Sequence, residues 1–372
     1  MKKVISSSFF PITLKALIIE DMKRRGGGQD SARIYASMFM AMGYDTYFLT
    51  NVSSVDGVSA GVAYRVEYEF RENSPALVDF IKIIRLKRQL MKIDISGFDV
   101  SFNNHPNVFI INGKINRLHG FSFLDPWLDE NGELSSHLPP AIFRVTRLYS
   151  TYNGSFFIPN SRYTRDISIK LFHELDLDVE MGDVIHPPVT VNKVDIGEKK
   201  EQVLLLGRIS RHKGIEDIAR IANDNSIRII VAGYVNKGDE GFVEKLRMYE
   251  GKNLEIRGNV SEEEKEKLMA ESSTILNMNR KENFGIAVAE AMSYGCIPVV
   301  PKSGGHWTDI VEMGKYGLGY GGQDELVEML NKSFLYTRTE RLKVAESVKR
   351  FSVQEFSRKI ANLIEKITPN RK

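Results

Sequence analysis

Residues 281–300 read KENFGIAVAEAMSYGCIPVV and form the most informative stretch of this 372-residue sequence. Phe284 to Tyr294 has the pattern of a helix, and an apolar run typical of a buried strand follows it. The first amides of a helix lack intrahelical partners and carry about half a positive charge. A diphosphate is therefore expected to bind at this helix start, on the amides of Phe284, Gly285 and Ile286.

A second stretch, residues 206–214, reads LGRISRHKG and follows an apolar run, Gln202 to Leu206, that is typical of a strand. Arg208 has the planar fork that matches phosphate oxygens, and Lys213 adds a compact positive charge. Doubly wound sheets bind ligands in the loops at the carboxyl ends of their strands. The stretch therefore predicts a second group of phosphate contacts.

Strands and helices alternate along the rest of the chain. Leu14 to Glu20 is an apolar run, a glycine-rich loop follows it, and helical periodicity begins at Ser31 and ends near Met42. This alternation implies parallel strands joined by helices. The same patterns predict strands at 46–49, 98–102, 115–118 and 155–158, and helices at 79–93, 141–152 and 164–175.

Val184 to Val189 contains paired prolines, which favour an extended connection and exclude a helix. The alternation restarts immediately after it, with helices predicted at 214–222, 242–249 and 262–271 and strands at 227–232, 254–256 and 274–278. We therefore predict an α/β protein with two doubly wound Rossmann-like domains that face a cleft. The predicted domains are residues 1–188 and 189–350, followed by a C-terminal helix in 351–372.

These stretches resemble the retaining glycosyltransferases of group 1, which have the GT-B fold and carry a Glu-x7-Glu motif and a Gly-Arg…Lys-Gly motif. Here the motifs read Glu282 to Glu290, and Gly207-Arg208 to Lys213-Gly214. The resemblance covers the C-terminal half well. The N-terminal half matches through its glycine-rich loop and its strand-end histidines, and the tail resembles the family's last helix, which returns to the N-terminal domain.

The resemblance implies retaining transfer of a hexose from a nucleotide diphosphate sugar, bound by residues 189–350, to a glycan or lipid-linked acceptor held by residues 1–188. It assigns contacts with the leaving group and the sugar to Arg208, Lys213, Glu282 and His119. It assigns donor binding to Gly27, Gly28, Gly207, Asn283, Phe284, Gly285, Ile286 and Glu290. His105, beside Pro106, is a weaker candidate for a sugar contact.

Two expected absences follow from the same resemblance. The departing phosphate takes the acceptor proton, so neither a metal nor a cofactor is expected. The single Asp-x-Asp sequence, Asp176-Leu-Asp178, lies in a charged loop and is interpreted as a chance match.

Residues 303–310 depart from the family pattern, since Asp309 stands where glutamate is commoner and His306 and Trp307 are unusual. A different preference for the sugar or the base is expected from this loop.

Composition narrows the class of protein. The net charge is +3, which is weak for a nucleic-acid reader. The only cysteine, Cys296, lies in an apolar run and is expected to be buried and inert, in a reducing compartment. No run approaches the ~18 apolar residues of a membrane span. We expect a cytoplasmic protein.

Residues 80–93 combine five basic residues with an apolar stripe, which leaves two interpretations open. One is an ordinary surface helix that packs on a sheet, and the other is peripheral contact with anionic lipid on the cytoplasmic membrane face. Two other functions also remain open: a nucleotide-sugar epimerase with the same architecture, and a non-catalytic nucleotide-binding protein. A glycan phosphorylase is disfavoured, because no lysine stands in a recognisable pyridoxal phosphate context.

Overall fold

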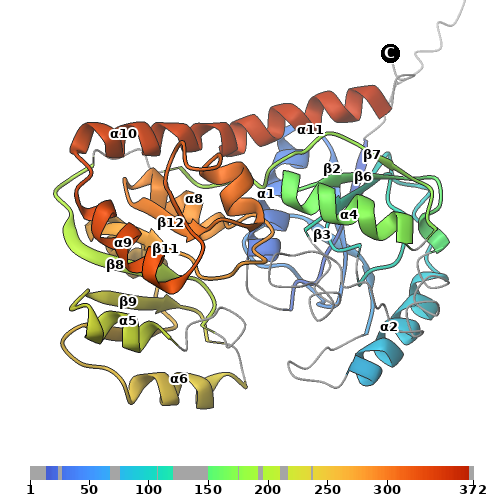
Figure 1. Ribbon diagram of the computed structural model, residues 1–372. Coiled ribbons are helices and arrows are strands. Elements are labelled where there is room, and N and C mark those ends of the chain that lie inside the picture. The colour runs from blue at the N-terminus through green and yellow to red at the C-terminus, as the bar shows by residue number, and fades with distance from the viewer. Residues whose placement is uncertain are drawn as a thin grey trace, which may run out of the picture. The chain divides into compact units, whose positions relative to one another are not determined.

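The computed structural model describes residues 14–23, 27–67, 76–106, 108–119, 150–174, 176–191, 196–209, 217–235 and 238–367, without the side chains of 76–80. The chain is α/β, with two parallel sheets that helices cover (Figure 1), as the alternation of apolar runs predicts. It divides into two compact units. The first unit is Met1–Phe70 with Pro75–Asn116, and the second is Arg71–Ser74 with Arg117–Lys372.

The first sheet has seven strands in the order β3-β2-β1-β4-β5-β6-β7. Its strands are β1 Lys15–Ile19, β2 Asp45–Thr50, β3 Gly61–Arg65, β4 Val100–Asn103, β5 Ile115–Leu118, β6 Ser155–Pro159 and β7 Val179–Met181. The central position of β1 explains its composition, because residues 16–19 are apolar and fully buried. The order reverses direction between β1 and β4, and such a reversal is the ligand-binding switch point of a doubly wound sheet.

Helix α1 spans Gly27–Ala41, so it begins four residues before the predicted start at Ser31. The side chain of Gln29 is buried and donates to the backbone carbonyl of Asp21 (2.7 Å), which fixes the first turn of this helix. A glycine-rich stretch that was predicted as a loop therefore contains helical residues. Long-range contacts, which no local pattern reports, override the low helix propensity of glycine.

The second sheet has six strands in the order β10-β9-β8-β11-β12-β13. Its strands are β8 Lys200–Leu206, β9 Ile229–Gly233, β10 Leu254–Gly258, β11 Ser272–Leu276, β12 Ile297–Pro301 and β13 Leu318–Tyr320. This order is that of a dinucleotide-binding sheet, with its reversal between β8 and β11. The loops after β8 and β11 are therefore the ones that the topology brings together at a ligand-binding edge.

The second unit contains eight α-helices among the residues that the structure describes. They are α4 Arg162–Glu174, α5 Ile218–Asp224, α6 Glu240–Arg247, α7 Glu262–Glu271, α8 Ile286–Ser293, α9 Gln323–Phe334, α10 Arg338–Ser347 and α11 Val353–Ile367. Helices α5 to α9 contact the second sheet or the helices on it, whereas α4 contacts β6 and β7 of the first sheet. In Figure 1, α10 and α11 follow one another through the short helix η5 (Val348–Phe351). The guanidinium of Arg117 lies 5.2 Å from the ring centre of Phe356 in α11, and Val189 forms an isolated bridge with Ser352.

The patterns did not predict β3, β7, β13, α9 and α10, and most of the helix predicted at 141–152 lies outside the described residues. The missed strands are short, at three to five residues, and β3 and β7 alternate between exposed and half-buried side chains rather than reading as apolar runs. Cys296 is buried, as predicted, and burial raises the pKa of its thiol. Within the part of the chain that the structure covers, no helix is both long enough and apolar enough to cross a bilayer.

Candidate functional site

The loop after β8 presents Arg208 at the switch point of the second sheet. The amide of Gly207 donates to the carbonyl of Ala232 (3.1 Å), and the amide of Ile209 donates to that of Tyr234 (2.9 Å). Ile209 is fully buried, whereas Arg208 between these anchors is exposed. The backbone is therefore held on both sides of the guanidinium. Lys213 and Gly214, the other predicted contacts of this loop, lie outside the described residues.

Gly233, at the carboxyl end of β9, allows this loop to pack closely. Its φ is +142°, and a Cβ there would lie 1.9 Å from the carbonyl oxygen of Gly207. Only glycine permits such an approach of two backbones. No local pattern predicts this close approach, because the two backbones meet only once β8 and β9 are paired.

The loop after β11 begins helix α8 at Ile286, two residues after the predicted start at Phe284. Gly285 is the N-cap of this helix and has φ +103°, a left-handed conformation in which the helix cannot extend further toward the N-terminus. Its carbonyl accepts from the amides of Val288 and Ala289. Phe284 is buried, with its ring centre 5.2 Å from that of Phe351. The predicted phosphate-binding amides thus span the residue before the cap, the cap and the first helical residue.

The two glutamates of the Glu-x7-Glu motif lie on either side of this helix start. Glu282 accepts a hydrogen bond from Asn277 through its side chain (3.3 Å) and from the amide of Gly305 through its carbonyl (2.7 Å). Glu290 lies on α8, and one of its carboxylate oxygens is 3.7 Å from the ammonium of Lys265. Lys265 comes from α7, and sequence reasoning did not identify it as a neighbour of Glu290.

Asn283, between Glu282 and Phe284, is held through its backbone carbonyl. That oxygen accepts from the hydroxyls of Ser161 (2.6 Å) and Thr164 (3.4 Å), both at the start of α4. A Cβ on Gly305 would lie 2.1 Å from the same oxygen. The loop Glu282–Ile286 is therefore clamped between the start of α4 and the segment that leads into helix η4, His306–Ile310.

Gly305→Ala is expected to destabilise the protein by about 1–3 kcal/mol or more, because the new methyl must displace the Asn283 carbonyl. The φ of Gly305 is −67°, which alanine adopts without strain. The change in stability therefore reports only the clash between the new methyl group and the Asn283 carbonyl. Urea unfolding would measure the change. Gly322→Ala is the matched control, since a Cβ there meets nothing within 4 Å, and equal stability loss in both variants would contradict the clamp.

Asp309, which stands in the unusual loop 303–310, is a buried anchor. Its carboxylate accepts from the amide of Arg162 (3.1 Å to both oxygens), the hydroxyl of Thr308 (2.6 Å) and the imidazole of His186 (2.8 Å). Its side chain is fully buried. His306 is also fully buried, and its Nδ1 accepts from the amide of Trp307 (3.0 Å). This part of the loop therefore joins η4 to the start of α4 and to His186.

Burial lowers the pKa of His186 below its ordinary 6.5, and this exceeds the opposing effect of Asp309. Lys359 and Arg117 also lower it. Burial acts to raise the pKa of Asp309, but its hydrogen bonds from His186 and Thr308 exceed that effect, so the pKa is lowered. Both groups therefore bind protons more weakly in the folded state than in the unfolded chain.

The free energy of unfolding is accordingly expected to fall as the pH drops below about 6.5, because the unfolded chain then binds a proton that folded His186 does not. Asp309 adds a further loss of unfolding free energy at lower pH, as the pH falls through the depressed pKa that its carboxyl has in the folded state. Chemical unfolding at about pH 7.5 and about pH 5.5 would measure the difference. His186→Gln should show a smaller difference, and an unchanged one would exclude His186 as its source.

His119, at the end of β5, is half-buried and near Asn160, whose side-chain nitrogen is 3.4 Å from His119 Nδ1. Asn160 is 3% exposed and was not predicted; its proximity arises because β5 and β6 end at the same edge. Gly27 and Gly28 are the first residues of α1 in the first unit, and the carbonyl of Gly28 accepts from Asn104 (3.4 Å). These two glycines and His119 thus belong to different units.

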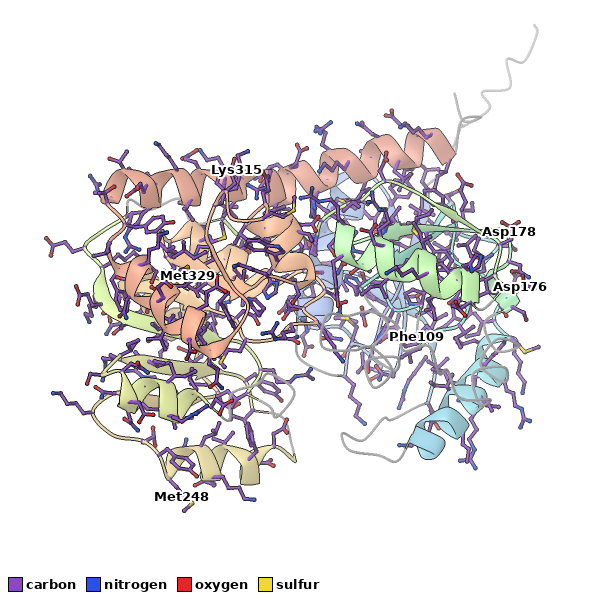
Figure 2. The ribbon with its side chains drawn as sticks, in the orientation of Figure 1. Phe109, Asp176, Asp178, Met248, Lys315 and Met329 are labelled. Atoms are coloured by element: carbon purple, nitrogen blue, oxygen red, sulfur yellow. The ribbon has the colours of Figure 1, made fainter. Side chains whose placement is uncertain are left out.

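Asp176 and Asp178 are exposed and lie in the turn between α4 and β7 (Figure 2). Asp178 directly precedes β7, so it lies at the amino end of a parallel strand. Ligands of doubly wound sheets bind at the opposite, carboxyl ends. The position of the Asp-x-Asp sequence therefore agrees with its interpretation as a chance match.

Residues 189–350 match the family model described as glycosyl transferases group 1. Among curated relatives, the chain is 26% identical to a GDP-Man:Man(3)GlcNAc(2)-PP-Dol alpha-1,2-mannosyltransferase of Mus musculus (47% of this chain, 42% of the relative) and 26% identical to a glycogen synthase of Aquifex aeolicus (43% and 34%). The chain thus spans less than half the length of these relatives.

Two solved structures share the fold. A sucrose-phosphate synthase of Thermosynechococcus elongatus has a TM-score of 0.72 at 14% identity, covering 96% of this chain and 100% of that one. The Anabaena protein Alr3699/HepE, in complex with UDP and glucose, has a TM-score of 0.66 at 16% identity, covering 95% and 100%. At these identities the likeness concerns the fold alone.

Proposed function

Because residues 189–350 belong to the glycosyl transferases of group 1, we propose that this chain transfers a hexose from a nucleotide diphosphate sugar to a hydroxyl acceptor. One observation carries the proposal. The anchored Arg208 loop and the clamped Glu282–Ile286 loop follow β8 and β11, which are neighbours at the switch point of the second sheet. A cation and helix-start amides at one ligand-binding edge suit a pyrophosphate.

The chemistry follows from the charge that develops during transfer. Breaking the bond from the anomeric carbon to oxygen places positive charge on the sugar and negative charge on the diphosphate. Arg208, Lys213 and the amides at the start of α8 would stabilise that negative charge without reorganising. Glu282 would contact the sugar and Glu290 the ribose hydroxyls. We propose retention of configuration, with the leaving phosphate accepting the acceptor proton and with no metal required.

The acceptor is proposed to be a glycan or a lipid-linked glycan, held by residues 1–188. The names of the Mus musculus and Dictyostelium discoideum relatives describe transfer to a dolichyl-diphosphate-linked glycan, and that of the Aquifex aeolicus relative describes glycogen synthesis. These names support a glycan acceptor of either kind. A cytoplasmic location is proposed as well, because the buried free thiol of Cys296 suits a reducing compartment.

A donor panel tests the proposal. The protein is incubated with nucleotide sugars, with and without glycan acceptors and with a metal chelator, and released nucleoside diphosphate and the anomeric configuration of the product are measured. Acceptor-dependent release with retained configuration, unaffected by the chelator, is expected. An epimerised donor without acceptor would favour the epimerase, and binding without turnover would favour a non-catalytic nucleotide-binding protein.

Helix α2, Ala76–Leu90, supports a further part of the proposal, contact with anionic lipid. Its inner face buries Leu86 and Leu90 in the core of the first unit. Its outer face exposes basic and apolar side chains at helical spacing. They are Ile81, Arg85 and Arg88 on the helix, and Met91 and Lys92 just past its end. An outer face that is both basic and apolar suits the headgroup region of an anionic bilayer.

Changing Arg85, Arg88 and Lys92 to glutamine together is expected to weaken binding to phosphatidylserine vesicles about 100-fold, at roughly 1 kcal/mol per basic residue. Vesicle flotation would measure the binding. The charge-matched control changes three exposed basic residues elsewhere: Lys343, Lys349 and Arg358. Equal loss in both triple variants, or no loss in either, would leave α2 as an ordinary surface helix.

A further inference from the structure

A histidine and a buried glutamate meet at the switch point of the first sheet. Glu20 directly follows β1, and His105 lies two residues after the end of β4, the neighbouring strand at the reversal of strand order. Both residues belong to the first unit. Neither is needed for the donor contacts proposed above, and the sheet's topology places them where a doubly wound sheet binds its ligand.

Glu20 is 2% exposed, and its carboxylate is held from several directions. One oxygen accepts from the amide of Asp21 (2.8 Å), and the other accepts from the side chain of Asn104 (2.5 Å). The side-chain nitrogen of Gln29 lies 3.5 Å from the first oxygen. A buried carboxylate that faces so many donors is held in one orientation.

His105 is fixed through its backbone, and its ring lies against Glu20. Its amide donates to the side chain of Asn103 (3.1 Å), and its carbonyl accepts from the amides of Val108 (3.1 Å) and Phe109 (2.9 Å). Its Nδ1 is buried and lies 3.2 Å from the carboxylate of Glu20, whereas the side chain as a whole is 31% exposed. Glu20 therefore faces the buried nitrogen of a side chain that is partly exposed.

The contact between the two residues decides the tautomer. A lone pair on Nδ1 would repel the carboxylate 3.2 Å away, so this contact favours the tautomer with a proton on Nδ1. In the neutral ring, Nε2 on the far side is then an acceptor. A positioned acceptor of this kind suits a hydroxyl group, which can donate to it.

We propose that His105, positioned by Glu20, accepts a hydrogen bond from a hydroxyl of the sugar acceptor. The proposal rests on the proposed function, because it takes the first unit to hold the acceptor. His105 is the group that touches the substrate. Glu20 is a positioning residue, which holds the ring and selects the tautomer.

Two substitutions of His105 separate its nitrogens. His105→Asn keeps a polar group near the position of Nδ1 and loses the one at Nε2, whereas His105→Gln keeps a polar group near Nε2. We expect His105→Asn to raise KM for the acceptor about tenfold, the effect of one lost hydrogen bond, and His105→Gln to raise it less than threefold. KM for the donor, and donor hydrolysis without acceptor, should stay unchanged in both variants.

Glu20→Gln tests the positioning role. Its amide group would face the side-chain amide of Asn104 or the ring, so KM for the acceptor is expected to rise while KM for the donor does not. His173→Asn and His173→Gln, on the exposed face of α4, are the matched controls. Thermal melting of every variant would confirm that each is folded.

The outcomes separate the two proposals. If the wild-type protein transfers sugar but His105→Asn leaves KM for the acceptor unchanged, or raises KM for the donor equally, the role of His105 is wrong and the proposed function stands. If the wild-type protein turns over no donor with any acceptor, both are wrong. A selective rise in acceptor KM with partial rescue by glutamine supports the inference.

Discussion

Arg208→Ala is expected to lower kcat for sugar transfer by about 10²–10³-fold, because removing one preorganised donor to a developing anion typically has that effect. Arg208 is exposed at the end of β8, and buried Ile209 next to it anchors the loop, so the truncation leaves the fold intact. Steady-state release of nucleoside diphosphate in the presence of acceptor would measure kcat. Circular dichroism and thermal melting should be unchanged.

Arg220→Ala is the matched control for this substitution. Arg220 lies on α5 of the same unit, is exposed, and pairs with Asp217 (3.1 Å). Pairs of this kind contribute at most about 1 kcal/mol to stability and would not affect catalysis. Full activity of the Arg208 variant, or an equal loss in the Arg220 variant, would remove Arg208 from the donor site.

Asp309→Ala is expected to lower the free energy of unfolding by about 3 kcal/mol or more, because breaking a buried charged network leaves its partners without an acceptor. Those partners are the imidazole of His186, the amide of Arg162 and the hydroxyl of Thr308. Urea unfolding would measure the loss. Asp309→Asn keeps one acceptor oxygen and should lose less.

Asp224→Ala is the control for general effects of removing a carboxylate, since Asp224 is exposed at the end of α5. If alanine at position 309 costs no more than alanine at position 224, the buried network contributes nothing measurable. A second consequence concerns activity. Asp309 joins η4 to the start of α4, whose Ser161 holds the carbonyl of Asn283, so the variant should also bind donor more weakly.

Local pattern was sufficient for the elements with strong periodicity or long apolar runs. The predicted strand 115–118 and helix 262–271 have the bounds that the structure gives to β5 and α7. Helix α7 has a clear local signal, since it begins at a Ser261 cap whose hydroxyl accepts from the amide of Glu264 (3.1 Å). Element boundaries set by distant contacts, such as the start of α1 at Gly27, were predicted wrongly.

The residues of the candidate site were likewise predictable only where the signal lies in a short stretch of sequence. The segments with Arg208, Glu282, Gly285 and Glu290 were identifiable because their chemistry lies in short runs of residues. Lys265 and Asn160 were not, because each acquires its neighbour from another strand or helix. His105 was visible as a strand-end histidine, but the buried carboxylate that orients it is 85 positions earlier in the chain.

Composition and periodicity were enough to establish an α/β chain with parallel sheets, and the residues 281–300 were enough to indicate its family. Both depend on interactions between residues close in sequence, where side-chain period and backbone conformation are linked directly. The strand order, the left-handed turn at Gly285, the clamp on Asn283 and the burial of Asp309 depend on pairs of segments far apart in the chain. Only the folded chain brings those pairs within a few ångströms, where close packing and hydrogen bonding act.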